Sequence, residues 1–232
     1  MTPDLTVAVF AYNEEANVRV AVSEILEELQ RLPATWELVF IDDGSADRTG
    51  AIAEEIAAAE PRVRVVRHGE NRGLGGAYRS GFEHARGRLL TFFPADGQFP
   101  PSIIGDFFRR IDGKDMVLGY LPPHRRPPLA RLASAAERVL YRALLGRMPR
   151  FQGILMFRRA ILDEVPLVSQ GRGWAVIMEL VWRAGRGGYR IESAPTELRP
   201  RLSGESKVMN RRAIAANLKQ LFALRRATRA DS

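Results

Sequence analysis

Continuous apolar runs alternate along the first half of the chain with segments in which apolar residues recur at helical spacing. The runs predict short strands at Leu5–Ala11, Trp36–Ile41, Val63–Val66, Leu89–Phe93 and Met116–Leu118. The intervening segments predict helices at residues 15–28, 47–59, 74–86 and 101–111. Strands and helices in alternation are typical of an α/β fold, with a mostly parallel, Rossmann-like sheet flanked by helices.

The pattern changes after a proline-rich loop at residues 121–128, whose prolines exclude regular structure. Apolar residues at 129–144 and at 211–226 recur at helical spacing, with arginines and lysines elsewhere on the turn. Both segments are predicted to be basic amphipathic helices, which pack either on the core or against a charged surface. Between them we predict strands at Ile154–Phe157 and Tyr189–Ile191 and a helix at Ala175–Ala184.

The size of the chain, 232 residues, suits one core. We expect one domain over residues 1–210 and a basic C-terminal helix over 211–232. Cysteine is absent, which excludes disulfides, and the three histidines are too far apart in sequence to suggest a zinc site. No run approaches the roughly 18–20 apolar residues that cross a bilayer, and the chain does not begin with a signal-peptide pattern. We therefore expect a cytoplasmic protein, peripheral at most to the inner face of the membrane.

The net charge of +8 is concentrated in two segments of the chain. Residues 121–150 carry seven arginines and one glutamate, and residues 199–232 carry nine basic and two acidic residues. Membrane lipid, a phosphorylated substrate or nucleic acid would each match this charge, and so would an ordinary solvated surface. Nucleic acid is disfavoured because aromatic residues are not interleaved with the arginines and no known binding module is present.

Polar residues follow each of the first four predicted strands. In a parallel sheet these strand ends meet at one edge, where ligands bind. Carboxylates and amides there accept hydrogen bonds from a base or ribose, and glycine lets backbone amides approach phosphate. The spacing is not Gly-x-Gly-x-x-Gly, which disfavours a dinucleotide dehydrogenase. The candidate nucleotide-binding residues are Tyr12, Glu14, Asp42, Asp43, Asn71 and Gly73.

Asp96 and Gln98, after the fourth strand, are candidate metal ligands. They offer a carboxylate and a neutral carbonyl oxygen, which Mg²⁺ or Mn²⁺ accepts while keeping waters and substrate phosphates as its other ligands. For every residue in these turns the alternative is a turn cap or a surface ion pair. Asp47 in particular is predicted to be the N-cap of the second helix.

Seven short motifs follow one another over about residues 5–207: Ala11–Glu15, Phe40–Thr49, Asn71–Gly75, Ala95–Gln98, Phe157–Arg159, Gly188–Glu192 and Arg201–Lys207. In this order they resemble the family-2 inverting glycosyltransferases with the GT-A fold. Within that family they are similar to the dolichyl-phosphate mannose synthase and polyprenyl-phosphate glycosyltransferase branch. The resemblance implies a nucleotide-sugar-binding half at residues 1–120 and an acceptor-side half at residues 121–210.

The resemblance also implies a role for each candidate residue. Tyr12, Glu14 and Asp43 line the base and ribose pocket, assisted by Asp42. A metal on the donor pyrophosphate is held by Asp96 and Gln98, and Arg201 closes over phosphate. Arg131 and Ser134 contact the phosphate of a lipid carrier at the membrane surface, where a separate membrane subunit is a further expected partner.

The chain departs from the pattern of this branch on the metal and acceptor sides. Pro94 stands where the first carboxylate of Asp-x-Asp is usual, and Phe10 stands where proline is usual. Residues 149–151 and Ile177 occupy places where acidic residues are common. A missing general base matters for a hydroxyl acceptor, whereas a lipid phosphate is already an anion at neutral pH.

These features together favour inverting transfer of a hexose from a GDP-mannose or UDP-glucose type donor to polyprenyl phosphate. The alternative is a non-catalytic or impaired nucleotide-sugar-binding homologue, or a partner subunit, that kept the pocket and lost part of the metal motif.

Overall fold

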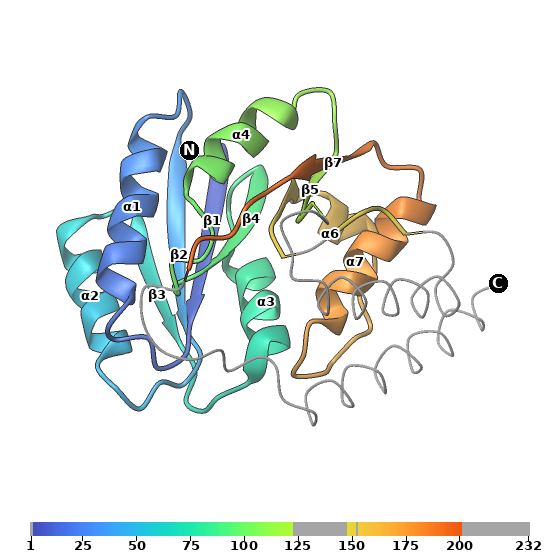
Figure 1. The fold of residues 1–232 in the computed structure, drawn as a ribbon. Helices are drawn as coiled ribbons and strands as arrows, with labels where there is room; N and C mark the ends of the chain where they lie inside the picture. The colour runs from blue at the N-terminus through green and yellow to red at the C-terminus, as the bar shows by residue number, and fades with distance from the viewer. Residues whose placement is uncertain (1, 123–147, 152, 201–232) are drawn as a thin grey trace.

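A seven-stranded sheet forms the centre of the protein in a computed structural model that describes residues 2–122, 148–151 and 153–200 (Figure 1). The strand order is β3-β2-β1-β4-β6-β5-β7. β6 pairs antiparallel with β4 and β5, and every other pair is parallel. The predicted mostly parallel α/β sheet is therefore confirmed. The strands are β1 Leu5–Ala11, β2 Trp36–Asp42, β3 Val63–Arg67, β4 Leu89–Pro94, β5 Met116–Tyr120, β6 Leu155–Arg158 and β7 Ile191–Pro195.

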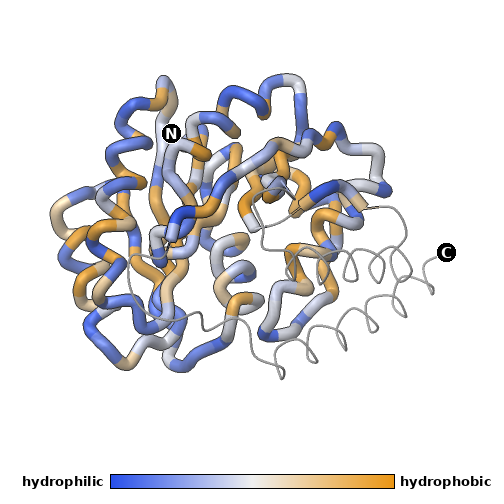
Figure 2. Tube along the Cα trace, in the orientation of Figure 1, coloured by the Kyte–Doolittle hydropathy of each residue, from blue (hydrophilic) through white to orange (hydrophobic). Residues whose placement is uncertain are grey.

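Helices cover both faces of the sheet and form two separate apolar cores with it. One core packs α1 (Val18–Gln30), α2 (Thr49–Ala59) and α4 (Ser102–Arg110) on one face. The other packs α3 (Gly73–His84), α7 (Ala175–Arg186) and the short α6 (Ile161–Glu164) on the opposite face. Apolar positions gather on the strands and on the helix sides that face them (Figure 2).

The burial pattern of β2 explains why it reads as a continuous apolar run. Leu38 and Phe40 belong to one core and Val39 and Ile41 to the other, so both faces of the strand are buried. Each fully buried aliphatic or aromatic side chain contributes roughly 1.5–3 kcal/mol relative to leaving it exposed. A central strand of a doubly covered sheet therefore has no polar face to alternate with.

Aromatic side chains fasten α3 to the sheet. Tyr78 packs edge-on against Phe92 of β4, with ring centroids 4.7 Å apart, and Phe82 packs against the same ring at 5.5 Å. Burial raises the pKa of the Tyr78 hydroxyl. The middle and the C-terminal half of α3 are thereby held against β4.

Two predicted elements differ clearly from the structure at their ends. The last strand begins at Ile191, where the predicted strand Tyr189–Ile191 ends, because β7 takes its register from parallel pairing with β5. The Tyr189 hydroxyl instead donates to Glu164 at 2.5 Å. The first helix begins at Val18 rather than at residue 15.

Other expectations fall outside the described residues. These include the predicted basic helices at 129–144 and 211–226, and the expected domain end at residue 210. Within the part of the chain that the structure describes, no helix is both long enough and apolar enough to cross a membrane.

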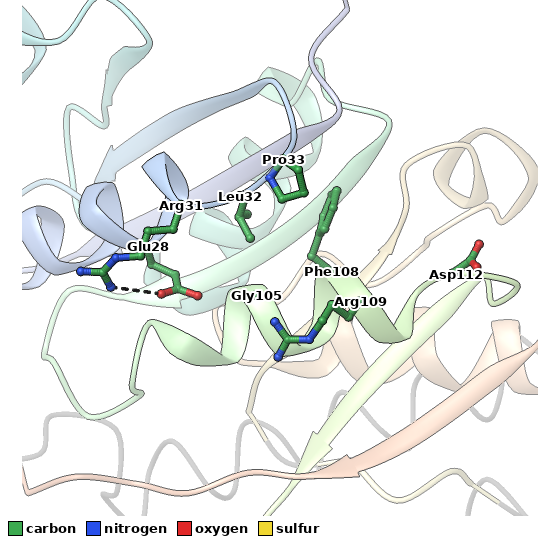
Figure 3. Close-up of a pocket in the computed structure, with 8 residues that line it drawn as sticks. All are labelled: Glu28, Arg31, Leu32, Pro33, Gly105, Phe108, Arg109 and Asp112. Atoms are coloured by element: carbon green, nitrogen blue, oxygen red, sulfur yellow. Dashed lines mark ion pairs between the residues drawn. The ribbon is translucent and has the colours of Figure 1, made fainter.

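A groove of about 430 Å³ opens between the C-terminal end of α1 and α4 (Figure 3). Leu32, Pro33 and Phe108 give it an apolar floor, and Arg31 lies 3.7 Å from Glu28 beside it. Both helices run antiparallel to their strands, so this groove lies at the amino edge of the sheet. Its mixed charges suit no particular ligand.

Candidate active site

The strand order places the candidate residues together at the carboxyl edge of the sheet. β1 lies between β2 and β4, and the register pairs Ala11 with Asp42 and Phe10 with Pro94. The chain order reverses direction between β1 and β4, which is the switch point where open α/β sheets bind ligands. Neighbouring strands are about 4.8 Å apart, so the ends of β2 and β4 are separated by roughly 10 Å. That width suits a nucleotide lying across β1.

The turn after β1 is fastened to the turn after β2 and to α2. The Asn13 amide donates to Ser45 Oγ at 2.9 Å, with a backbone φ of 52° at Asn13. The Glu14 amide donates to Thr49 Oγ1 at 2.8 Å, and Glu14 Oε2 accepts from Asn17 Nδ2 at 2.6 Å. Glu14 is buried, whereas Tyr12 is 38% exposed at the rim. The turn therefore presents the Tyr12 ring on a rigid base.

Asp42 shapes the turn after β2 from inside the protein. Its side chain is 1% exposed, Oδ1 accepts the Ser45 amide at 3.0 Å, and Oδ2 lies 3.3 Å from Arg67 Nε. These contacts account for the burial of the carboxylate without a ligand. Assistance to a nucleotide from Asp42 stays a prediction.

The predicted N-cap at Asp47 is wrong by one residue. The N-cap of α2 is Arg48, which makes no side-chain capping bond. The Asp47 carboxylate nevertheless accepts the Thr49 amide at 3.0 Å and the Glu15 amide at 3.2 Å. Asp47, the residue before the N-cap, thus accepts from one of the backbone amides at the start of α2 that have no partner within the helix.

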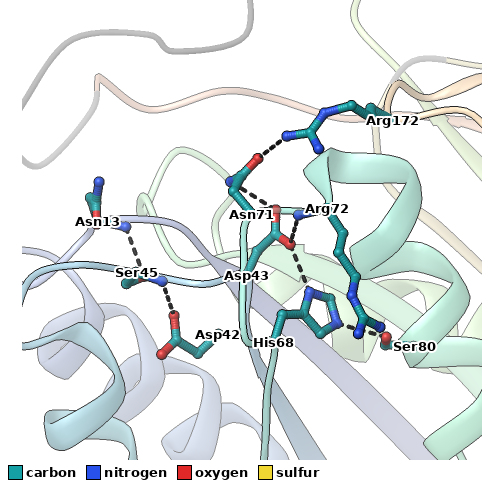
Figure 4. A network of polar contacts seen from close by, with 9 residues as sticks. All are labelled: Asn13, Asp42, Asp43, Ser45, His68, Asn71, Arg72, Ser80 and Arg172. Atoms are coloured by element: carbon teal, nitrogen blue, oxygen red, sulfur yellow. Dashed lines mark hydrogen bonds and ion pairs between the residues drawn. The ribbon is translucent and has the colours of Figure 1, made fainter.

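Asp43 is the centre of a buried polar network at the ends of β2 and β3 (Figure 4). Its Oδ1 accepts the Arg72 amide at 2.8 Å and lies 2.7 Å from His68 Nδ1. Its Oδ2 accepts from Asn71 Nδ2 at 3.1 Å. One carboxylate therefore holds the whole turn between β3 and α3.

Asn71 extends this network to the segment before α7. Its Oδ1 accepts from Arg172 Nη2 at 2.5 Å while its Nδ2 donates to Asp43 (Figure 4). Arg79, one turn and a half into α3, donates to the carbonyls of Ser169 and Gly171. Burial, and then the charge of Arg72, lowers the pKa of the Arg79 guanidinium. The turn between β3 and α3 and the segment before α7 are therefore connected by hydrogen bonds into one unit.

Gly73 and Gly75 lie against the backbone of residues 171–173. A Cβ on Gly73, where φ is 73°, would lie 2.5 Å from the Arg172 carbonyl oxygen. A Cβ on Gly75 would lie 2.1 Å from the Gly171 carbonyl oxygen. The glycines thus permit two segments of this chain to pack closely. Contact of Gly73 with a nucleotide stays a prediction.

Asp96 and Gln98 form a tight turn beyond β4. Asp96 Oδ1 accepts the Gln98 amide at 3.0 Å, and the Gln98 carbonyl accepts the Arg199 amide at 2.7 Å. Asp96 is 6% exposed. The Arg199 side chain donates to Glu24 at 3.0 Å. The segment after β7 is therefore tied directly to the turn that carries Asp96.

The donor set at this turn suits only a weakly held cation. The described residues contain no group of three or more acidic, histidine or cysteine side chains that could hold a metal. Asp96 supplies one carboxylate, and Pro94 supplies none. Such a set fits Mg²⁺ or Mn²⁺ whose remaining ligands are substrate phosphates and water.

Three predicted site residues lie outside the described residues: Arg131, Ser134 and Arg201. Three further residues of the site region were not predicted. His68 directly follows β3, which ends at Arg67. The predicted strand ended one residue earlier, at Val66, so His68 was not recognised as the residue after the strand end. Arg172 carries no recognisable sequence signal.

Glu179 is the third, and it is fully buried in α7. It accepts the amides of Val168 and Ser169 and, at 2.8 Å, the Nε–H of Arg183. A charged residue on the apolar side of the helix was the available signal. The two amide bonds to its carboxylate hold the segment that leads to Arg172.

Comparison with known proteins identifies the family. Residues 6–165 match the model of glycosyl transferase family 2. The chain belongs to this family.

The names of two relatives of this family-2 glycosyltransferase include a lipid phosphate. A polyprenol monophosphomannose synthase of Mycolicibacterium smegmatis is 30% identical over 85% of the chain and 78% of the relative. A dolichol-phosphate mannosyltransferase of Pyrococcus furiosus is 28% identical over 88% of the chain. The chain spans 59% of the length of the second protein.

Solved structures confirm the predicted GT-A fold. A mannosyltransferase of Pyrobaculum calidifontis, in complex with GDP-Man and Mn²⁺, superposes with a TM-score of 0.66 at 21% identity, over 99% of this chain and 65% of that one. A glucosyl-3-phosphoglycerate synthase of Mycobacterium tuberculosis, in complex with UDP, gives the same score at 21% identity, over 94% and 80%. The predicted family and fold are therefore both correct.

Proposed function

We propose that this glycosyltransferase moves a hexose, with inversion, from a nucleotide diphosphate sugar of the GDP-mannose or UDP-glucose type to a polyprenyl phosphate. The observation that carries the proposal is the placement of Asp43 and Asp96 on strand ends that flank β1. The names of the two relatives support the lipid phosphate as acceptor.

The base and ribose of the donor bind over the ends of β1 and β2. Tyr12 offers an exposed ring for stacking, and the carboxylates of Glu14 and Asp43 accept from base N–H or ribose hydroxyl groups. Asn71 and Gly73 complete the rim. Asp42 acts through the shape of the turn, since its oxygens already bind Ser45 and Arg67.

The donor pyrophosphate lies toward the end of β4. Asp96, with Gln98 beside it, would hold Mg²⁺ or Mn²⁺, and the bound cation would supply stabilisation of the charge that develops on the departing diphosphate. Arg201 adds a guanidinium to the same phosphates. The bond between the Gln98 carbonyl and the Arg199 amide supports this role, because it ties the preceding segment to the Asp96 turn.

The acceptor phosphate needs no general base. One of its oxygens attacks the anomeric carbon in line, the bond from that carbon to the diphosphate oxygen breaks, and the nucleoside diphosphate leaves with the electron pair. Ile177 stands at a position where this branch of the family commonly has an acidic residue. Its side chain is 2% exposed and packs in the core formed by α3, α6 and α7. Arg131 and Ser134 bind the lipid phosphate, at the cytoplasmic surface of the membrane and with a separate membrane subunit as a further partner.

The experiment is a transfer assay with purified protein, polyprenyl phosphate, and either GDP-mannose or UDP-glucose. Extraction of the lipid and mass spectrometry measure glycolipid in Mg²⁺, in Mn²⁺ and in chelator. We expect product with one donor and metal, and none with Asp96→Ala. Absence of product across both donors and both metals would contradict the proposal.

A second candidate function is nucleotide-sugar binding without transfer. It is favoured by Pro94 in place of the first metal-binding carboxylate. Binding of nucleotide that is unchanged by metal and by Asp96→Ala, together with absent transfer, would support it. Appearance of transfer activity in Pro94→Asp would identify an impaired enzyme instead.

A further inference from the structure

His68 connects Ser80 of α3 to the Asp43 carboxylate through an unbroken chain of hydrogen bonds. Its Nε2 lies 2.8 Å from Ser80 Oγ, and its Nδ1 lies 2.7 Å from Asp43 Oδ1 (Figure 4). All three residues are buried, with exposures of 7% for His68, 6% for Ser80 and 5% for Asp43. The imidazole is thus fixed at both nitrogens, between β3 and α3.

This order of groups, Ser80–His68–Asp43, is that of a hydrolase triad, but its surroundings exclude that chemistry. Ser80 lies inside α3 rather than on an exposed turn, and its side chain is covered. A nucleophilic serine needs access to a substrate carbonyl. The chain of bonds therefore works as support for Asp43.

The bonds to Asp43 divide its two oxygens into different roles. Oδ1 accepts from His68 and from the Arg72 amide, which together occupy its two acceptor positions. Oδ2 accepts one bond among the described residues, the 3.1 Å contact from Asn71. Within the part of the chain that the structure describes, one lone pair of Oδ2 is left to accept from a ligand.

We propose that His68 is a positioning residue for nucleotide binding. By donating Nδ1–H to Asp43 Oδ1, it fixes the carboxylate in the rotamer that leaves Oδ2 available for a base N–H or ribose hydroxyl. This inference rests on the proposed function, since it assumes that Asp43 contacts the donor nucleotide. Ser80 Oγ, 2.8 Å from Nε2, anchors the other side of the ring and so sets its plane.

The physical reason is preorganisation. A free aspartate side chain rotates about two bonds, and a ligand that uses one oxygen must first restrict that motion. A charge-assisted hydrogen bond from a buried, two-point-anchored imidazole restricts the motion before the ligand arrives. Loss of this bond therefore weakens nucleotide binding, without removing any group that touches the nucleotide.

Two substitutions separate the two nitrogens of His68. In His68→Asn the amide nitrogen takes the place of Nδ1, so the bond to Asp43 persists while the contact with Ser80 is lost. In His68→Gln the longer side chain reaches the place of Nε2, so the Ser80 contact persists while the bond to Asp43 is lost. If His68 served folding alone, both variants would change the nucleotide Kd to a similar extent.

Calorimetric titration with GDP and with UDP measures the outcome, with thermal melting as the check on folding. We expect His68→Gln to raise the Kd of the preferred nucleotide about tenfold and His68→Asn to change it by less than about threefold. Ser80→Ala should fall between them. His84→Asn, at the other end of α3, is the matched control and should leave the Kd unchanged.

A double-mutant cycle tests whether His68 acts through Asp43. In an Asp43→Asn background, we expect His68→Gln to have no further effect on the Kd. Additive effects would overturn the inference, as would equal Kd values for His68→Gln and His68→Asn. Weakening by Asp43→Asn but not by His68→Gln would refute the inference alone. Absence of any nucleotide binding by the parent protein would remove the proposed function and the inference together.

Discussion

The amide nitrogen of Gly75 donates to the carbonyl oxygen of Arg172 at 2.9 Å. This bond joins the first turn of α3 to the segment before α7, nearly a hundred residues later in the chain. The contact is possible because position 75 has no Cβ. The start of α3 and the segment before α7 are therefore docked through backbone at the carboxyl edge of the sheet.

Gly75→Ala should destabilise the protein, although alanine is the better helix former by about 1 kcal/mol. The added Cβ would lie 2.1 Å from one backbone oxygen and 2.6 Å from another, so the segment 171–173 must move. We expect a net loss of about 2 kcal/mol in the free energy of unfolding, measured by urea denaturation.

Gly69→Ala is the control for this substitution, because a Cβ at Gly69 meets no atom within 4 Å. It should leave the urea midpoint unchanged or raise it slightly. Equal midpoints for the two variants would show that the segment before α7 is not held against α3 as described.

Asp96→Asn should reduce glycosyl transfer more than it reduces folding. The amide keeps an acceptor for the Gln98 amide but removes the only carboxylate charge at this turn. We expect the transfer rate to fall by about a hundredfold and the metal concentration for half-maximal rate to rise. The exposed Asp112→Asn, at the amino edge of the sheet, is the control. A rate that matches this control would rule out a metal role for Asp96.

Glu37 should make folding stability depend on acid pH. Burial acts to raise the pKa of Glu37, but the hydrogen bonds from Thr6, the Arg86 amide and Arg64 outweigh it and lower the pKa below its ordinary value of 4.5. A lowered folded-state pKa gives stability that is complete above pH 4.5 and is lost as pH falls through the folded value.

Glu37→Gln tests this dependence by urea denaturation between pH 7 and pH 3. We expect the variant to be less stable than the parent by roughly 1–3 kcal/mol at pH 7, with the difference shrinking below pH 4.5. Glu27→Gln, on the exposed side of α1, should follow the parent at every pH. A difference that stays constant with pH would mean that the Glu37 charge does not contribute.

Glu179→Gln should be the most destabilising single change among the acidic residues considered. The carboxylate is fully buried, and neutralising it leaves the Arg183 guanidinium, 17% exposed, without its counter-charge. We expect a loss of about 3 kcal/mol or more, measured as a shift of the thermal and urea midpoints.

The double variant Glu179→Gln with Arg183→Met should recover part of that loss, since it removes the uncompensated charge. Glu83→Gln, on the exposed side of α3, is the control and should change little. No recovery in the double variant would indicate that Glu179 acts chiefly through the amides of residues 168 and 169.

The sequence by itself determined the sheet and the edge at which the site lies. A continuous apolar run such as Leu38–Ile41 has to be covered on both faces, and parallel strands so covered bring Tyr12, Asp43 and Asp96 to one side. The apolar runs and the alternation of strands with helices suffice to predict these features, because both can be read from short segments of the chain.

Only the tertiary structure decided what each polar group binds. His68 meets Ser80 because of the rotation of α3 on the sheet, and Arg172 meets Asn71 although 101 positions separate them. The start of β7 was likewise set by its pairing with β5. Such contacts depend on strand register and helix rotation, which are fixed by the packing of side chains from distant segments and leave no periodic signal in the sequence.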